Sequence, residues 1–240
     1  MTYGTRTESY VCVDLETTGL NPKTDKIIEV GAVKVENGRI VRVFETLVNP
    51  GRPIPENVRQ LTDICTARLQ NAPKIEEVLP DLLDFLGDSV LLGHQVLFDY
   101  SFIKKEAVNH KKSFEKTGID TLRIARKFLP DLESRSLGFL CRHYAIPHRP
   151  HRALQDAQAA CALYDRLWEE FGEAEDAVKL FTPKPLLYQA KRETPITPSQ
   201  KERLYKLLVR HKLNIEYNLD ALTRSEASRY TDRILAKYGR

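Results

Sequence analysis

The sequence lacks any apolar run long enough to cross a membrane, and its first residues, Met1 to Arg6, lack the hydrophobic core of a signal peptide. Both absences favour a cytoplasmic protein. Cysteine is also scarce, and the four residues lack the paired spacing of a zinc site or a disulfide framework: Cys12, Cys65, Cys141 and Cys161. We therefore expect free thiols without a function in metal binding or catalysis.

Charge is unevenly distributed along the 240 residues, which suffice for one large domain or for an ordinary domain with a small appendage. Residues 182–240 contain 13 Lys and Arg against 6 Asp and Glu, whereas residues 1–181 contain 24 against 27. A basic tail after an acidic body indicates an anionic partner. We expect that partner to be nucleic acid rather than a membrane.

The most informative stretch is residues 11–20, where apolar residues alternate and then run into a polar turn that contains Gly19. This pattern predicts a strand, on which Asp14 and Glu16 share one face at a spacing of roughly 6.5–7 Å. Two carboxylates this close repel each other unless a cation lies between them. In a simpler interpretation, one caps the following turn and the other is solvated. We favour a cation site, because an otherwise apolar strand has little reason to carry two acids on one side.

The hydrophobic pattern predicts three strands first, the second and third joined by a hairpin at Asn37-Gly38. Helices and a further strand follow, so we expect an α/β sandwich with a mixed sheet. The later strand is predicted at 90–94, and the helices at 74–86, 98–110, 122–128, 137–144 and 152–171.

The hydrophobic periodicity of the sequence stops after Phe181. This change predicts a domain at 1–181, a linker at 182–196 and a small basic helical module at 197–240. Two capping boxes, at Thr197 and Thr223, predict helices over 198–212 and 224–238. Our hypothesis is that this module raises the local concentration of a nucleic-acid strand, so that truncation after Phe181 would weaken binding to long strands at low salt.

Two further carboxylates stand out by their context. Asp99 lies where a predicted strand ends and a helix begins, a position that a simple helix cap would also explain. Asp156 lies near the start of the long helix, five residues after His151. If both were helical they would differ by about 140° around the axis, so His151 would stand beside a cation held by Asp156 and could accept a proton from water. Taken alone, His151 is an ordinary loop histidine, and His148 is a close rival.

Together these residues resemble the motifs of a known family. Asp14-x-Glu16-Thr17-Thr18-Gly19, His94-x-x-x-Phe98-Asp99 and His151-x-Ala153-x-x-Asp156-Ala157 are similar to the three motifs of the DEDDh 3′→5′ exonucleases. This ribonuclease-H-like group includes the proofreading exonucleases of bacterial DNA polymerase III and several RNA-trimming nucleases. The resemblance covers roughly residues 8–171. Arg152 excludes the related branch, which has Tyr four residues before the last Asp, and Gln95 departs from the Asn of many members.

The resemblance implies a ribonuclease-H-like mixed sheet flanked by helices, and a hydrolase that removes nucleoside 5′-monophosphates from single-stranded DNA ends in proofreading or repair. It also implies two Mg²⁺ or Mn²⁺ ions, hard cations that suit carboxylate ligands, and a DNA polymerase subunit as a partner. The implied roles are metal binding for Asp14, Glu16, Asp99 and Asp156, general-base catalysis for His151, and contact with the terminal nucleotide for Thr17 and Leu20.

Two alternatives belong to other classes. The same fold could trim RNA 3′ ends, or the chain could bind nucleic acid without cleaving it. Loss of catalysis usually erodes the acids, and all four are present. We therefore expect an enzyme, and DNA in preference to RNA.

Overall fold

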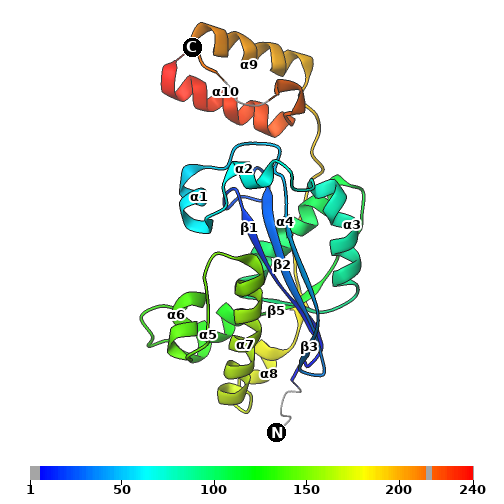
Figure 1. The fold of residues 1–240 in the computed structure, drawn as a ribbon, viewed down its shortest axis with the longest axis vertical. Coiled ribbons are helices and arrows are strands. Elements are labelled where there is room, and N and C mark those ends of the chain that lie inside the picture. The colour runs from blue at the N-terminus through cyan, green and yellow to red at the C-terminus, as the bar shows by residue number, and fades with distance from the viewer. Residues whose placement is uncertain (1–5, 215–217, 240) are drawn as a thin grey trace. The chain divides into compact units, whose positions relative to one another are not determined.

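The computed structural model describes residues 6–214 and 218–239, and it divides into two compact units (Figure 1). The sheet unit comprises Met1–Pro50 and Ile54–Ala190, and the helical unit comprises Gly51–Pro53 and Lys191–Arg240. In the part of the chain that the structure describes, no helix is both long and apolar enough to span a membrane.

A six-stranded mixed sheet in the order β3-β2-β1-β4-β5-β6 forms the centre of the sheet unit. β1 pairs antiparallel with β2 and parallel with β4, β2 and β3 form the predicted hairpin, and β5 pairs parallel with β4 and antiparallel with β6. Asn37 and Gly38 both have positive φ, which the tight turn requires. The strands are β1 (Tyr10–Thr17), β2 (Ile27–Glu36), β3 (Arg39–Leu47), β4 (Leu91–Gly93), β5 (Thr117–Asp120) and β6 (Lys184–Pro185).

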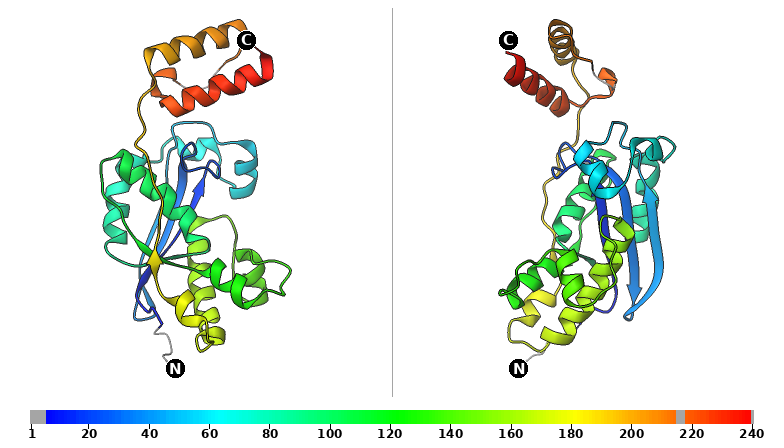
Figure 2. Two further views of the ribbon diagram at one scale, coloured as in Figure 1. Left: turned by 180° about the vertical axis from the view of Figure 1, so that it is seen from behind. Right: turned by 60° about the vertical axis from the view of Figure 1, so that its left-hand side comes forward.

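Helices cover both faces of this sheet (Figures 1 and 2). One face packs against α3 (Ile75–Leu86) and α4 (Val96–Asn109). The other packs against α5 (Thr121–Phe128), α6 (Leu137–His143), α7 (Ala153–Phe171) and α8 (Ala177–Phe181). Two short helices, α1 (Glu56–Thr62) and α2 (Thr66–Leu69), contribute to a separate apolar cluster around Ile28. The expected fold class, a ribonuclease-H-like mixed sheet between helices, is confirmed.

The two-residue period of β1 determines which side chains face which helices. Val11, Val13 and Leu15 belong to the core beneath α3 and α4, whereas Tyr10 and Cys12 belong to the core beneath α7. The same alternation turns Asp14 and Glu16 toward the α7 side.

The helical unit is built from α9 (Pro198–Arg210), the 3₁₀ turn η1 (Leu219–Ala221) and α10 (Arg224–Tyr238). Both predicted capping boxes are present, at Thr197 and Thr223. Its core is small and consists of Leu204, Leu207, Leu208, Leu222, Ala227 and Ile234.

The segment after Phe181 was expected to be a linker without regular structure, but its first part belongs to the sheet unit. Lys184 and Pro185 form the edge strand β6, and the amide of Leu186 donates to the carbonyl of Lys116 at 2.9 Å. Leu186 and Tyr188 also pack against the core beneath α3 and α4. A truncation after Phe181 would remove these contacts, so the boundary for such an experiment lies after Ala190.

Candidate active site

Three carboxylates converge between β1 and the start of α7. Asp14, Glu16 and Asp156 each offer an oxygen, and these oxygens lie within 4.8 Å of one another. The two β1 residues are half-buried and Asp156 is buried. The chain thus gathers three like charges from positions about 140 residues apart, which is costly unless a positive charge or protons compensate them.

The protonation behaviour of the two β1 carboxyls reflects this crowding. Burial raises the pKa of Asp14 well above its usual range, and the charges of Asp99, Asp156 and Glu16 raise it further. Burial and the charges of Asp156 and Glu29 raise the pKa of Glu16 to about 8, although Arg152 opposes the shift. The oxygen donors and the mutual repulsion fit a divalent hard cation such as Mg²⁺ or Mn²⁺.

Asp99 approaches the site from α4 and is not the N-cap of that helix, because the helix begins at Val96. Its Oδ1 accepts a hydrogen bond from the amide of Leu15 at 3.0 Å. β4 ends at Gly93 and pairs with β1 only at Val11 and Cys12, so this amide has no strand partner and the carboxylate provides the acceptor. Asp99 therefore ties α4 to the β1 segment that carries the other two acids.

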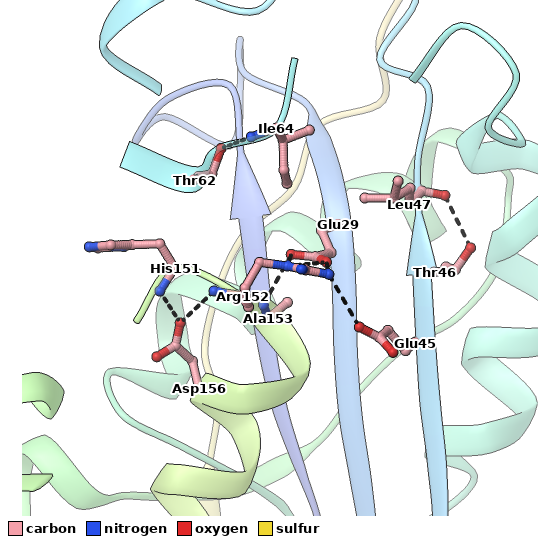
Figure 3. Close-up of polar contacts among 10 residues, drawn as sticks. All are labelled: Glu29, Glu45, Thr46, Leu47, Thr62, Ile64, His151, Arg152, Ala153 and Asp156. Atoms are coloured by element: carbon pink, nitrogen blue, oxygen red, sulfur yellow. Dashed lines mark hydrogen bonds and ion pairs between the residues drawn. The ribbon is translucent and has the colours of Figure 1, made fainter. Parts of the chain in front are cut away.

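The two candidate histidines contact different oxygens of the Asp156 carboxylate. Nε2 of His148, whose side chain is buried, contacts Oδ1 of Asp156. His151 contributes only its backbone, whose amide donates to Oδ2 at 2.8 Å, and its ring is directed away from Asp156 (Figure 3). His151 has a φ of 65°, and α7 begins two residues later at Ala153, so the helical-angle argument from the sequence does not apply.

Glu29 on β2 was not singled out from the sequence, yet it anchors the start of α7 (Figure 3). Its carboxylate is completely buried and accepts from Nη2 of Arg152 at 2.8 Å and from the amide of Ala153 at 3.1 Å. Gly31, also on β2, leaves the space that α7 needs, because a Cβ there would lie 2.1 Å from the backbone of Ala153 and Leu154. In the sequence, Glu29 stands out as an acid inside an apolar run.

A family model described as "Exonuclease" matches residues 11–164, which is more than half of the chain. The chain belongs to this exonuclease family. Its three motifs and the sheet topology place it in the DEDDh group of 3′→5′ exonucleases, which are phosphodiester hydrolases.

Two of the proteins similar to this exonuclease are named as DNA polymerase III proteins, and a third is described in a complex with DNA. The DNA polymerase III subunit epsilon of Aquifex aeolicus is 39% identical over 164 residues, which are 68% of this chain and 81% of that protein. The PolC-type DNA polymerase III of Clostridium perfringens is 39% identical over 170 residues, 70% of this chain. The matched part of this chain corresponds to only 12% of the length of that polymerase. A structure of Exonuclease X in complex with 5′ overhanging duplex DNA is 26% identical, with a TM-score of 0.57, and the match covers 72% of this chain and 99% of that one.

The second motif of the exonuclease is held firmly at the carboxyl end of β4. Nε2 of His94 lies 2.8 Å from the carbonyl oxygen of Arg135, to which it donates, and burial lowers the pKa of this histidine. Gln95, the departure from the family pattern, has a φ of 75°. Its backbone amide donates to Oδ1 of Asp120 at 2.9 Å. Asn tolerates this left-handed conformation better than Gln, which explains why the position favours Asn.

The turn after β1 presents an apolar side chain to solvent. Oγ1 of Thr17 donates to the carbonyl of Gly19 at 2.7 Å, and Oγ1 of Thr18 accepts from the amide of Lys26 at 2.9 Å. Gly19 is tightly enclosed, since a Cβ there would lie 2.6 Å from Oδ2 of Asp25. These contacts fix the turn, and Leu20 at its tip is 85% exposed.

We expect the loss of Arg152 to destabilise the fold more than the loss of its partner Glu29. Arg152→Gln leaves the Glu29 carboxylate buried without its cation, which should lower the free energy of unfolding by about 3–5 kcal/mol. Glu29→Gln should cost less, because the Arg152 side chain is 25% exposed and retains Glu45 at 3.5 Å. Urea unfolding of both variants and of the double variant measures the coupling. Equal and additive losses would show that the two side chains do not act as a pair.

Proposed function

We propose that the exonuclease uses two divalent cations, Mg²⁺ or Mn²⁺, to remove nucleoside 5′-monophosphates from the 3′ ends of single-stranded DNA. The observation that carries this proposal is the convergence of Asp14, Glu16 and Asp156, whose ligand oxygens lie within 4.8 Å of one another. Asp99 completes the proposed ligand set, and its charge already raises the pKa of Asp14. When bound, such a pair of cations would stabilise charge on the attacking and leaving oxygens of an in-line displacement.

The proton of the attacking water would go to His151. Imidazole exchanges protons near neutral pH, which suits a general base. The backbone of His151 is fixed through its hydrogen bond to Asp156, while its ring is directed away from that carboxylate and is free to meet a substrate (Figure 3). His148 would keep Asp156 in place instead, because it contacts Oδ1 from a buried position.

The terminal nucleotide would be held by the turn after β1. We assign its base to Leu20, because a side chain that is 85% exposed on a fixed turn offers apolar surface to a flat ring. Thr17, the last residue of β1, lies next to the metal-binding carboxylates and would contact the same nucleotide.

Single-stranded DNA is favoured over RNA because the relatives are named as DNA polymerase III proteins and Exonuclease X is described with overhanging DNA. These relatives also support a function in proofreading or repair in the cytoplasm, with a DNA polymerase subunit as a partner. RNA trimming by the same residues is the second candidate.

The experiment that separates DNA from RNA compares hydrolysis of 5′-labelled single strands of equal length and matched sequence in Mg²⁺ and in Mn²⁺. We expect a higher kcat/KM for DNA with either ion, and nucleoside 5′-monophosphates as products. A higher kcat/KM for RNA would instead assign 3′-end trimming of RNA. Binding of both strands without hydrolysis would leave only the non-catalytic alternative.

A further inference from the structure

We propose that the outer face of α9 is a second binding site for single-stranded nucleic acid, in which Tyr205 stacks on a base and the surrounding cations contact phosphates. The site lies in the helical unit, outside the family match at residues 11–164. The inference rests on one part of the proposed function, namely that the substrate of the exonuclease is a single strand of nucleic acid. The binding itself does not require hydrolysis.

The packing of α9 determines which side chains are left outside. Leu204, Leu207 and Leu208 are buried in the small core of the helical unit. Tyr205 and Val209, one helical turn apart, are 58% and 60% exposed. Residues four apart are neighbours on a helix surface, so these two form a continuous apolar strip. An exposed tyrosine in such a strip is a platform on which any base can stack.

Tyr205 lines two hollows of the surface. One, of about 770 Å³, is also lined by the cations Arg203, Lys206 and Arg210 and by one acid, Glu202, which pairs with Lys206. The other, of about 460 Å³, is lined by Tyr205, Val209, Lys212 and residues beyond the end of α9. The first hollow therefore combines the aromatic ring with three cationic side chains and the second with one, Lys212, so a strand bound across Tyr205 would lie within reach of cations in both hollows.

The cations of this face are largely available to a ligand. Lys206 pairs with Glu202 at 2.7 Å on the exposed surface, a contact of small energetic value. For Arg203, Arg210 and Lys212, the described residues provide no ion-pair partner. The charge of residues 182–240, 13 Lys and Arg against 6 Asp and Glu, complements a phosphate backbone. Cations alone would form an ordinary solvated face, and the exposed Tyr205 is what favours nucleic acid over that interpretation.

The test uses the full chain in EDTA, so that binding is measured without hydrolysis. Fluorescence anisotropy with labelled dT30 and rU30 gives Kd over a series of salt concentrations. We expect Tyr205→Ala to weaken binding about 5- to 150-fold, the range for one base stacked on an aromatic ring. We expect Arg203→Gln with Arg210→Gln to lower the slope of log Kd against log salt by about 1.4, because each phosphate contact on a single strand contributes about 0.7.

The matched control changes the same charge on the other helix, with Arg233→Gln and Lys237→Gln on α10. This variant should retain the wild-type slope of log Kd against log salt, and its affinity should decrease only slightly. Thermal unfolding of all variants verifies that they fold. Equal effects of the α9 and α10 variants, or unchanged binding by Tyr205→Ala, would overturn the site and would leave a solvated face or a protein-docking surface. Hydrolysis of a 5-nucleotide strand by the wild-type chain in Mg²⁺ tests the nuclease proposal separately. A preference for rU30 over dT30 would identify the strand as RNA while retaining the site.

Discussion

Asp14→Asn should reduce hydrolysis by about 1,000-fold or more while leaving the fold intact. The substitution removes a carboxylate from the group that would hold the cations, and several kcal/mol of charge stabilisation correspond to a factor of this size. Single-turnover hydrolysis at saturating Mg²⁺ measures the loss. Asp156→Asn should behave similarly, because its carboxylate belongs to the same group.

The same substitution should maintain or raise the melting temperature of the metal-free protein. Burial and neighbouring charges raise the pKa of Asp14 in the folded state, so the ionised carboxylate opposes folding above its ordinary pKa. Asn removes this penalty near neutral pH, and the gain should disappear at low pH, where Asp is protonated in both states. Asp81→Asn, an exposed position on α3, is the control and should change neither activity nor stability. Near-normal hydrolysis by Asp14→Asn would refute the metal assignment.

His151→Ala and His148→Ala should produce different kinds of loss. As the proposed general base, His151 should contribute about 10²- to 10⁴-fold to the rate. Its removal should also flatten the acidic limb of the pH–rate profile at saturating Mg²⁺, where bound cations would keep the carboxylates ionised and the protonation of the base would limit the rate. Binding of Mn²⁺, measured by calorimetry, should change little, since the ring of His151 is directed away from Asp156 (Figure 3).

For His148→Ala we expect weaker Mn²⁺ binding and a retained acidic limb of the pH–rate profile. From the sequence this residue was only a rival of His151, but the structure brings its Nε2 to Oδ1 of Asp156. Loss of this contact should leave one carboxylate of the proposed ligand set less well oriented. If His148→Ala removed the acidic limb and His151→Ala did not, the two assignments would have to be exchanged.

The strand that carries Asp14 and Glu16 could be predicted from the sequence, because alternation along a strand is a local property. The role of Glu29 could not be predicted, because its partner Arg152 lies 123 residues away and only the folded structure brings the two together. The placement of His148 depends on the loop before α7, where Ala145 and His151 have positive φ without being glycine. Such conformations are imposed by the surrounding structure rather than by the residues themselves. Strand β6 was missed because two residues, one of them Pro185, carry no periodic signal.

The most direct test of metal-dependent hydrolysis from the 3′ end uses a 30-nucleotide single strand of DNA with different labels on its two ends. With the wild-type chain and Mg²⁺, we predict that the 3′ label is released first, as a mononucleotide, while the 5′ label marks a ladder of progressively shorter strands. EDTA or Asp14→Asn should stop both processes. Metal-dependent hydrolysis from the 3′ end would be contradicted by release of the 5′ label first, by cleavage inside the strand, or by undiminished hydrolysis in EDTA.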